Sequence, residues 1–316
     1  MSGFTITAGV SFSGGITMTE APVGNTAGWF GGGYDSVSTV QRITFATDTN
    51  TASVRGPLSL ARQRLAAAGN TTDGWFGGGT NPGYASRVDR ITYATDTATA
   101  SVRGPLSSAR YGLAAAGNTT DGWFGGGGPG PLSTVDRITY ATDTATASVR
   151  GPLSLARTRP TAAGNATDGW FGGGYASGNR STVDRITYAT DTATASVRGP
   201  LSQARVSLAA AGNTTDGWFS GGGVPGGGTS STVDRITYAT DTATASVRGP
   251  LSVARNAPAA AGNTDYGWFG GGYAGGGAGL KSTVDRITYA TDTATASVRG
   301  PLSAATRYLA AAGGLQ

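Results

Sequence analysis

The chain has 316 residues, a formal net charge of +5, and neither cysteine nor histidine. The lack of cysteine excludes a disulfide framework and thiolate chemistry, and the lack of histidine removes the commonest general base and the commonest transition-metal ligand. No apolar run is long enough to span a bilayer, and the first residues lack the charged start and apolar core of a signal peptide. We therefore expect no membrane insertion.

Residues 1–24 do not match the rest of the chain. Apolar side chains stand at even spacing in a Gly/Ser/Thr background there: Phe4, Ile6, Val10, Phe12, Ile16 and Met18. Such alternation indicates a strand, and an isolated strand can extend the sheet of a partner. We interpret residues 1–24 as an N-terminal extended arm that anchors the protein. The alternative is an arm that packs on its own domain.

Residues 25–316 contain six copies of the motif Trp-Phe-Gly-Gly-Gly, with Ser220 replacing the first glycine of the fifth copy. The tryptophans follow one another at spacings of 46, 48, 47, 48 and 50 residues: Trp29, Trp75, Trp123, Trp170, Trp218 and Trp268. The 22-residue stretch 133–154 recurs unchanged from residues 181, 231 and 282. A period of this length is typical of propellers and solenoids.

One repeat, residues 110–154, predicts four strands. Residues 113–116 are a short run of mostly small apolar side chains, which suits an innermost strand where blades converge. The aromatic pair at 123–124 opens a second strand that three glycines end. Residues 135–140 are rich in β-branched and aromatic side chains, and residues 147–150 are followed by a Gly-Pro break.

Six such repeats predict an all-β fold, a six-bladed β-propeller with four antiparallel strands in each blade. The first copy begins at its second strand, and the last copy ends with a lone first strand at residues 308–312. We therefore expect the C-terminal strand to complete the first blade, which hides the edges that an open sheet would expose. This divides the chain into an arm (1–24) and a propeller (25–316).

The repeat resembles the kelch repeat over roughly residues 25–316. The glycine doublet after an aromatic pair carries the resemblance, together with an aromatic residue downstream: Phe45, Tyr93, Tyr140, Tyr188, Tyr238 and Tyr289. The tryptophan that usually follows in kelch repeats is replaced by Ala, Ser or Val. The resemblance implies a partner-binding propeller. The copper oxidase activity found in the family needs histidine and cysteine ligands, so it is not implied here.

Differences between copies gather in two stretches. The loop after the glycines has 4, 6, 5, 6, 8 and 9 residues in successive copies, which accounts for all the length variation between tryptophans. The second stretch precedes each first strand and reads Gln63-Arg64, Tyr111-Gly112, Thr158-Arg159, Val206-Ser207, Asn256-Ala257 and Arg307-Tyr308. In an up-and-down blade both stretches lie at the same end of the strands. The two constant turns and both chain ends then lie at the opposite end.

Loops on a rigid scaffold commonly carry recognition, and tyrosine among Gly, Ser and Asn is typical of binding loops. We therefore predict a binding surface for a host-surface glycan or protein on the variable stretches. The candidate residues are Tyr34, Asp35, Gln63, Arg64, Asn81, Tyr84, Tyr111, Arg159, Tyr175, Asn179, Arg180, Asn256, Tyr273, Lys281, Arg307 and Tyr308. The alternative is drift, because long surface loops tolerate change at little cost.

The repeated charged residues are interpreted as structural. Adjacent pairs such as Asp136-Arg137 recur with the blades, which favours pairing within the sheets over a basic footprint for nucleic acid. The aspartate of each Thr-Asp-Thr turn, as at Asp143, is interpreted as a turn cap and not as a calcium ligand. No catalytic constellation stands out, so we expect no catalytic residues, no metal and no cofactor.

These patterns favour a non-enzymatic structural and recognition protein on a virion surface, such as a fibre, spike or capsid decoration. The arm would join a virion structural protein, which places the propeller outside the cell. The alternatives are a secreted lectin or adhesin, another kelch-type scaffold, an enzyme with a site in the central channel, and an engineered consensus propeller. Thr306 replaces an arginine found in the other copies, so we expect a looser seam where the ring closes.

Overall fold

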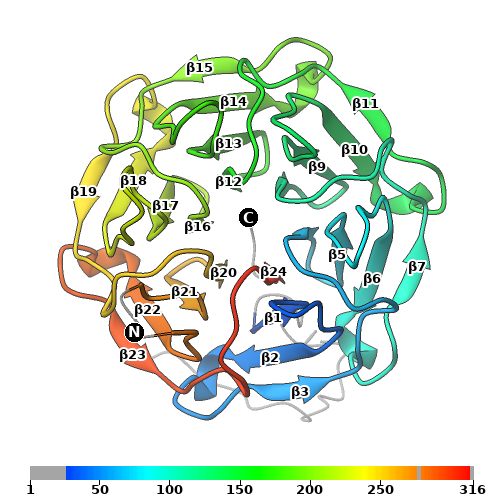
Figure 1. The fold of residues 1–316 in the computed structure, drawn as a ribbon, viewed down its shortest axis with the longest axis horizontal. Helices are drawn as coiled ribbons and strands as arrows, with labels where there is room; N and C mark the ends of the chain where they lie inside the picture. The colour runs from blue at the N-terminus through cyan, green and yellow to red at the C-terminus, as the bar shows by residue number, and fades with distance from the viewer. Residues whose placement is uncertain (1–25, 276–278, 314–316) are drawn as a thin grey trace, which may run out of the picture.

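The computed structural model describes residues 26–275 and 279–313. Six antiparallel sheets of four strands stand around a central axis like the blades of a propeller (Figure 1). The predicted fold class is therefore confirmed. The arm residues Phe4, Ile6, Val10, Phe12, Ile16 and Met18 lie outside the described residues.

We number the blades by the tryptophan that each contains. From the axis outward, blade 1 is β24 (Ala310–Ala312), β1 (Ala27–Gly31), β2 (Val40–Thr44) and β3 (Ser53–Arg55). Blade 2 is β4 (Ala66–Gly69), β5 (Asp73–Gly77), β6 (Val88–Thr92) and β7 (Ser101–Arg103). Blade 3 is β8 (Ala114–Gly117), β9 (Asp121–Gly125), β10 (Val135–Thr139) and β11 (Ser148–Arg150). Blade 4 is β12 (Thr161–Gly164), β13 (Asp168–Gly172), β14 (Val183–Thr187) and β15 (Ser196–Arg198).

Blade 5 is β16 (Ala209–Gly212), β17 (Asp216–Ser220), β18 (Val233–Thr237) and β19 (Ser246–Arg248). Blade 6 is β20 (Ala259–Gly262), β21 (Tyr266–Gly270), β22 (Val284–Thr288) and β23 (Ser297–Arg299). The helical segments of the described chain are 3-10 turns after the third strand of each blade: η2 (Phe45–Thr47), η3 (Tyr93–Thr95), η4 (Tyr140–Thr142), η5 (Tyr188–Thr190), η6 (Tyr238–Thr240) and η7 (Tyr289–Thr291).

The predicted third strand is one residue too long, because Tyr140 begins η4 instead of ending β10. Its ring stacks on Trp75 of the preceding blade, with centroids 3.7 Å apart. Every blade repeats this contact with its neighbour, and Trp268 on Phe45 closes the circle at 3.8 Å. Stacked pairs of this kind add to the area that the aromatic side chains bury. They form the core between blades.

The aspartates of the Thr-Asp-Thr turns also hold adjacent blades together, a role that their interpretation as turn caps did not include. Asp143 Oδ2 accepts the Trp75 indole N–H over 2.8 Å. The same oxygen lies 3.1 Å from Arg90 Nη1 and 3.4 Å from Arg103 Nε, both in blade 2. Three donors from one blade thus converge on one buried carboxylate of the next.

Adjacent Asp and Arg residues do not pair with each other, which corrects the expectation for Asp136 and Arg137. Successive strand residues point to opposite faces of a sheet. Asp136 accordingly binds Arg110 Nη2 at 2.7 Å, and Arg137 binds Asp191 at 3.1 Å. The Arg110–Asp136 pair is fully buried, and four other crossovers between blades carry the same pair at 2.5 to 3.0 Å: Arg62–Asp89, Arg157–Asp184, Arg205–Asp234 and Arg255–Asp285.

The ring closes as predicted, because β24 pairs antiparallel with β1, with Ala312 opposite Trp29. The closing crossover has Thr306 at the arginine position, and Gln41 stands at the position of the partner aspartate. Gln41 Oε1 accepts hydrogen bonds from the backbone N–H and the hydroxyl of Ser303. Both charges are therefore replaced together. No buried charge is left unpaired at this crossover, and the looser seam expected from Thr306 stays a prediction.

Candidate functional site

Both variable stretches lie on one face of the ring. The segment that joins the fourth strand of one blade to the first strand of the next is here called a connector. One residue of each connector pairs through its backbone with the first residue after the glycines, as for Gln63↔Thr80, Tyr111↔Gly128, Thr158↔Tyr175, Val206↔Gly223 and Asn256↔Tyr273. In blade 1 the Tyr34 N–H donates to the Arg307 carbonyl over 2.8 Å. We call this the variable face: loops 32–39, 78–87, 126–134, 173–182, 221–232, 271–275 and 279–283, with connectors 56–65, 104–113, 151–160, 199–208, 249–258 and 300–309.

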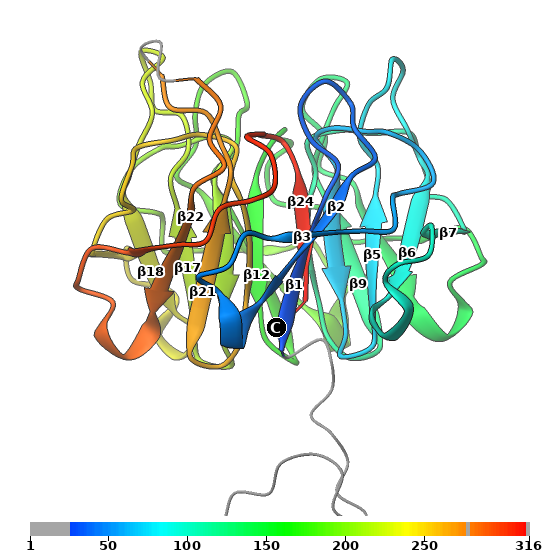
Figure 2. The same cartoon turned by 90° about the horizontal axis from the view of Figure 1, so that it is seen from below.

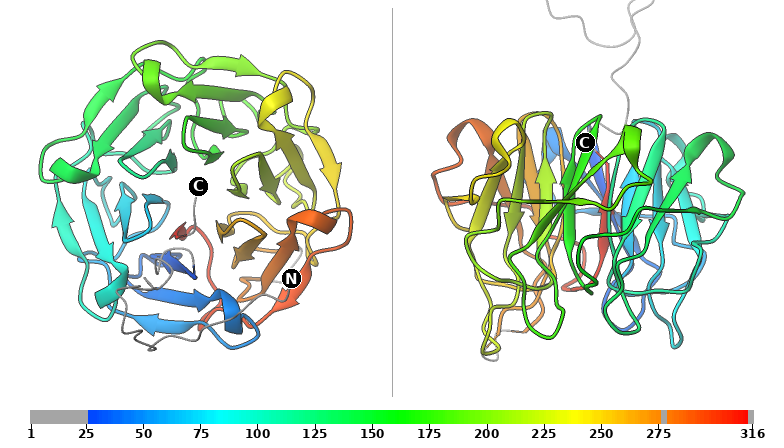
Figure 3. Two further views of the ribbon diagram at one scale, coloured as in Figure 1. Left: turned by 180° about the vertical axis from the view of Figure 1, so that it is seen from behind. Right: turned by 90° about the horizontal axis from the view of Figure 1, so that it is seen from above.

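The two side views show the long loops along one edge of the ring (Figure 2) and the end of β24 toward the other edge (Figure 3). Antiparallel pairing places the start of β1 beside the end of β24. The constant turns before β5 and its counterparts share that opposite edge. The described chain therefore enters and leaves the propeller on the side away from the variable loops.

A closed ring of hydrogen bonds surrounds the axis on the variable face. One connector residue in each blade donates its N–H to the carbonyl of the equivalent residue in the preceding blade, over 2.6 to 3.2 Å. The six residues of this inner ring are Arg64, Gly112, Arg159, Ser207, Ala257 and Tyr308. The bond from the Arg64 N–H to the Tyr308 carbonyl, 2.8 Å long, completes the circle.

All six inner-ring residues have left-handed backbone, with φ between 54° and 62°. Only Gly112 adopts this conformation without a steric cost; each of the others pays about 1–2 kcal/mol. The cost is offset because each ring residue forms two interblade hydrogen bonds. The ring thus fixes the backbone while its side chains differ from blade to blade.

Seven side chains form a continuous cluster across blades 6, 1 and 2, which we call the tyrosine–arginine ladder. The Arg307 guanidinium lies over the rings of Tyr34, Tyr273 and Tyr308, 4.7 to 4.9 Å from their centroids. Arg64 lies over Tyr308 at 4.5 Å and over Tyr111 at 5.6 Å.

The ladder ends where Tyr84 stacks on Tyr111 at 5.1 Å. Contacts of this kind between a cation and an aromatic ring contribute about 0.5–1 kcal/mol each at exposed sites. Tyr84 is exposed by 50% and Tyr34 by 37%. The ladder therefore presents flat aromatic surface and positive charge together.

The variable face also carries the unbalanced charge. Seventeen arginines pair with carboxylates in the seams and sheets. Six cations have no carboxylate partner among the described residues, and all lie on the variable face: Arg64, Arg87, Arg159, Arg180, Lys281 and Arg307. Asp35 is the one described carboxylate on that face outside an ion pair. The repeated arginines are therefore paired structurally, whereas the unpaired cations are concentrated on one face.

A pocket of about 440 Å³ opens between the variable loops of blades 4 and 5. Its lining comes from both loops and from three connectors, and it includes Arg159, Tyr175, Asn179, Val206 and Asn256. The Asn179 side-chain amide donates to the Gly223 carbonyl over 3.0 Å, which ties the two loops together. The pocket falls in the size range of small-molecule sites.

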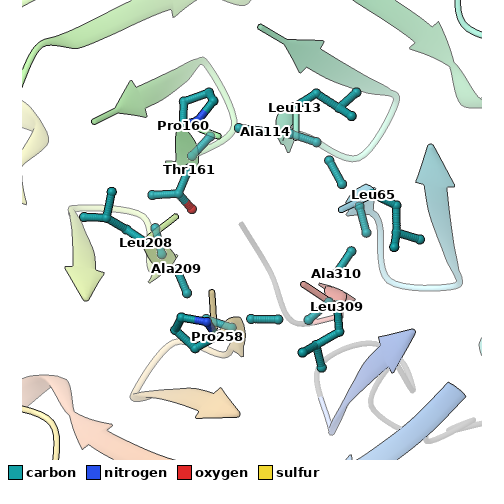
Figure 4. A pocket seen from close by; sticks show the side chains of 18 residues that line it. Leu65, Leu113, Ala114, Pro160, Thr161, Leu208, Ala209, Pro258, Leu309 and Ala310 are labelled. Atoms are coloured by element: carbon teal, nitrogen blue, oxygen red, sulfur yellow. The ribbon is translucent and has the colours of Figure 1, made fainter. Parts of the chain in front are cut away.

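The central channel has a different character (Figure 4). A void of about 100 Å³ lies between the six innermost strands, and alanine, leucine and proline line it. Thr161 contributes the one polar side chain among the described lining residues. A reaction that needs a general acid or base therefore finds no titratable side chain in this part of the described channel.

The predicted site residues separate into three groups. The ladder contains seven of them: Tyr34, Arg64, Tyr84, Tyr111, Tyr273, Arg307 and Tyr308. The pocket is lined by four others: Arg159, Tyr175, Asn179 and Asn256. The others lie on the variable face outside both: Asp35, Gln63, Asn81, Arg180 and Lys281.

The prediction missed Arg87 and Val206. Arg87 replaces the threonine of an otherwise constant Ser-Thr-Val-Asp stretch, and this departure is the signal that could have found it. Val206 lies in the variable connector stretch, and its place in the pocket lining depends on the conformation of the two loops.

Within residues 26–275 and 279–313, no group of three or more Asp or Glu side chains is placed to hold a metal ion. The same residues contain no helix that is long and apolar enough to cross a membrane.

These features define a six-bladed β-propeller with a constant scaffold and one variable face, an architecture that fits a recognition or binding scaffold. No protein-family model matches the sequence, and no curated protein matches it. Among solved structures, the chain is similar to one titled "Structure of YjhT", with a TM-score of 0.71 and 12% sequence identity. The match covers 87% of this chain and 95% of that chain. At this level of identity, the similarity shows the fold alone.

Proposed function

We propose that this propeller is a non-enzymatic recognition protein that binds its partner through the variable face. One observation carries the proposal: the unpaired cations and the tyrosine–arginine ladder gather on the face where the repeats differ. Tyrosine and arginine are the residues that most often dominate binding energy at interfaces. The positive charge favours an anionic partner surface and speeds encounter with it.

The propeller is kelch-like in the order of its strands and glycines, and we place it on a virion surface as a fibre, spike or capsid decoration. In this proposal residues 1–24 join a virion structural protein, and the variable face meets a glycan or protein of the host surface. The positions of β1 and β24 support this arrangement, since residues 26 and 313 both lie opposite the variable loops.

A glycan array tests the recognition face. We expect the wild-type protein to bind a subset of anionic glycans, and the double variant Arg64→Gln/Arg307→Gln to lose at least tenfold in affinity. Asp265→Asn is the control for a substitution away from the variable face, because Asp265 lies in a turn on the opposite face. Equal loss in the control, or equal binding to a DNA duplex with the same dependence on Arg64, would contradict the proposed partner class.

Cryo-electron microscopy of native particles from the source tests the virion assignment. We expect propeller density on the particle surface with the long loops outward, and detachment of the propeller when residues 1–24 are removed. Particles without propeller density would contradict the virion assignment. The glycan array would then be the remaining test of recognition by the variable face.

A further inference from the structure

The pocket between the loops of blades 4 and 5 contains a donor and an acceptor that the protein leaves unsatisfied. The Arg159 guanidinium has no ion pair with any described carboxylate, and its Nε is buried without a hydrogen-bond partner, as is the Nε of every other arginine except Arg87. Asn256 Oδ1 is likewise buried without a donor. Buried polar atoms cost free energy unless a partner satisfies them. Both residues line the same pocket, so one ligand can lie against both side chains.

Apart from Asn179, the rest of the lining is aromatic or apolar side chains and glycine backbone. Tyr175 is exposed by 41% and offers a ring face, and Val206 offers a methyl surface. Gly226 and Gly227 have left-handed backbone, and no atom lies within 4 Å of the position where a side chain would begin. Glycine at such positions lets a ligand approach the backbone closely. The pocket therefore combines a cation, a hydrogen-bond acceptor and a flat apolar wall.

We propose that this pocket binds a carboxylated pyranose, such as the terminal uronate of an acidic polysaccharide; this rests on the proposed function and names a ligand class for it. The ligand carboxylate accepts hydrogen bonds from the Arg159 guanidinium, and a ring hydroxyl donates to Asn256 Oδ1. The apolar face of the sugar packs on the Tyr175 ring. A simple anion would satisfy Arg159 but would leave the acceptor and the aromatic wall unused.

Two features of the sequence build this pocket. The loop in blade 5 is long and contains three consecutive glycines, Gly226 to Gly228, whereas the loop in blade 3 has a Pro-Gly-Pro turn at the corresponding place. The inner-ring residue is arginine only at Arg64 and Arg159, and Arg64 is engaged with the rings of Tyr308 and Tyr111. Arg159 has no such contact.

Titration calorimetry of the full chain tests the site with tri-galacturonate as the probe and maltotriose as the neutral control. We expect tri-galacturonate to bind and maltotriose to bind at least tenfold more weakly. Arg159→Gln should weaken tri-galacturonate at least tenfold, because a hydrogen bond to a charged group is lost. Val206→Phe should abolish binding by filling the pocket.

Arg180→Gln is the matched control. It removes one positive charge from the blade 4 loop, yet Arg180 does not line the pocket and donates to the Ala176 carbonyl and the Ser177 hydroxyl of its own loop. We expect its affinity to stay within twofold of wild type. Equal weakening by Arg180→Gln and Arg159→Gln would overturn the site in favour of general electrostatic attraction.

Two other outcomes would also overturn the proposal. Binding of acetate and phosphate as tight as that of tri-galacturonate would show an anion site and no sugar site. If tri-galacturonate does not bind but glycan-array binding still depends on Arg64 and Arg307, the pocket is not a uronate site. The proposal that the variable face is a recognition surface would then be unaffected. Failure of both assays would contradict the proposed function itself.

Discussion

Trp268 of the last repeat donates its indole N–H to Asp48 of the first repeat over 2.8 Å, although 220 residues separate them. Arg286 and Arg299 of blade 6 reach the same carboxylate, at 3.0 and 3.5 Å. The closing seam therefore has the same indole–aspartate–arginine arrangement as the five internal seams.

Asp48→Asn should destabilise the propeller by about 2–3 kcal/mol. The substitution leaves two arginines without a carboxylate, and the partial exposure of these arginines reduces the cost below that of a fully buried pair. Urea unfolding followed by tryptophan fluorescence measures the change. Asp35→Asn, an exposed carboxylate outside any ion pair, should change stability by less than about 0.5 kcal/mol. Equal effects of the two variants would show that Asp48 does not hold the seam.

Arg62→Thr should cost about 3–5 kcal/mol, because Asp89 stays buried without its cation. The double variant Arg62→Thr/Asp89→Gln should recover at least half of this loss. It reproduces the Thr306 and Gln41 combination, in which glutamine accepts hydrogen bonds from a serine of the connector. Ser59 occupies the corresponding place and already donates to Asp89.

A double-mutant cycle that includes Asp89→Gln alone gives the coupling energy of the pair. Simple addition of the two single effects would contradict the interpretation that the closing crossover is a compensated, neutral version of the other five.

The protein should lose stability steeply above pH 10. Burial raises the pKa of five stacked tyrosines above the ordinary value of 10.0: Tyr93, Tyr140, Tyr188, Tyr238 and Tyr289. The folded state then holds these phenol protons more tightly than the unfolded state. Their contribution is intact below pH 10 and is lost as the pH rises further, by about 1.4 kcal/mol per pH unit for each tyrosine.

Circular dichroism between pH 8 and 12 checks this prediction. Tyr140→Phe should make the alkaline transition shallower by one proton and should change stability little at pH 7, since the Tyr140 hydroxyl has no hydrogen-bond partner among the described residues. The first repeat already carries Phe45 at this position. An unchanged slope in the variant would contradict the role of the buried phenols.

Ala257→Gly should stabilise the protein by about 0.5–1 kcal/mol, because Ala257 has φ of 54° in the inner ring and glycine adopts that conformation without a steric cost. Gly112→Ala should do the opposite. An added methyl there would lie 2.9 Å from Arg159 Cγ and 3.0 Å from Thr158 Oγ1, with φ of 62°. Thermal unfolding of the two variants gives the comparison, and shifts of the same sign would refute it.

The scaffold could be predicted from sequence because every copy repeats the same local signals. The number and order of strands in a blade follow from signals within one repeat. These signals are the glycines after Trp123-Phe124, the β-branched residues in β10 and the Gly-Pro break after β11. The residue at the end of β10 was misassigned, because the stacking of Tyr140 on Trp75 is a contact between blades that no local pattern contains.

The sequence predicts on which face of the propeller the variable residues lie, but not which of them contact one another. Up-and-down topology alone places both variable stretches at one end of the blades. The ladder joins Tyr273, Arg307 and Arg64 across the closing seam, and the pocket joins Arg159 to Asn256 across two blades. Such meetings depend on ring closure and on loop conformation, which residue spacing within one repeat does not determine.

The unequal distribution of charge gives the molecule an electrostatic dipole along the propeller axis. The variable face carries six unpaired cations and one carboxylate, while the arginines elsewhere are balanced by aspartates in the seams. Near an anionic cell envelope, such a dipole turns the variable loops toward the surface before any specific contact forms. Because the Debye length is about 8 Å in physiological salt, this alignment acts only over the last nanometre of approach.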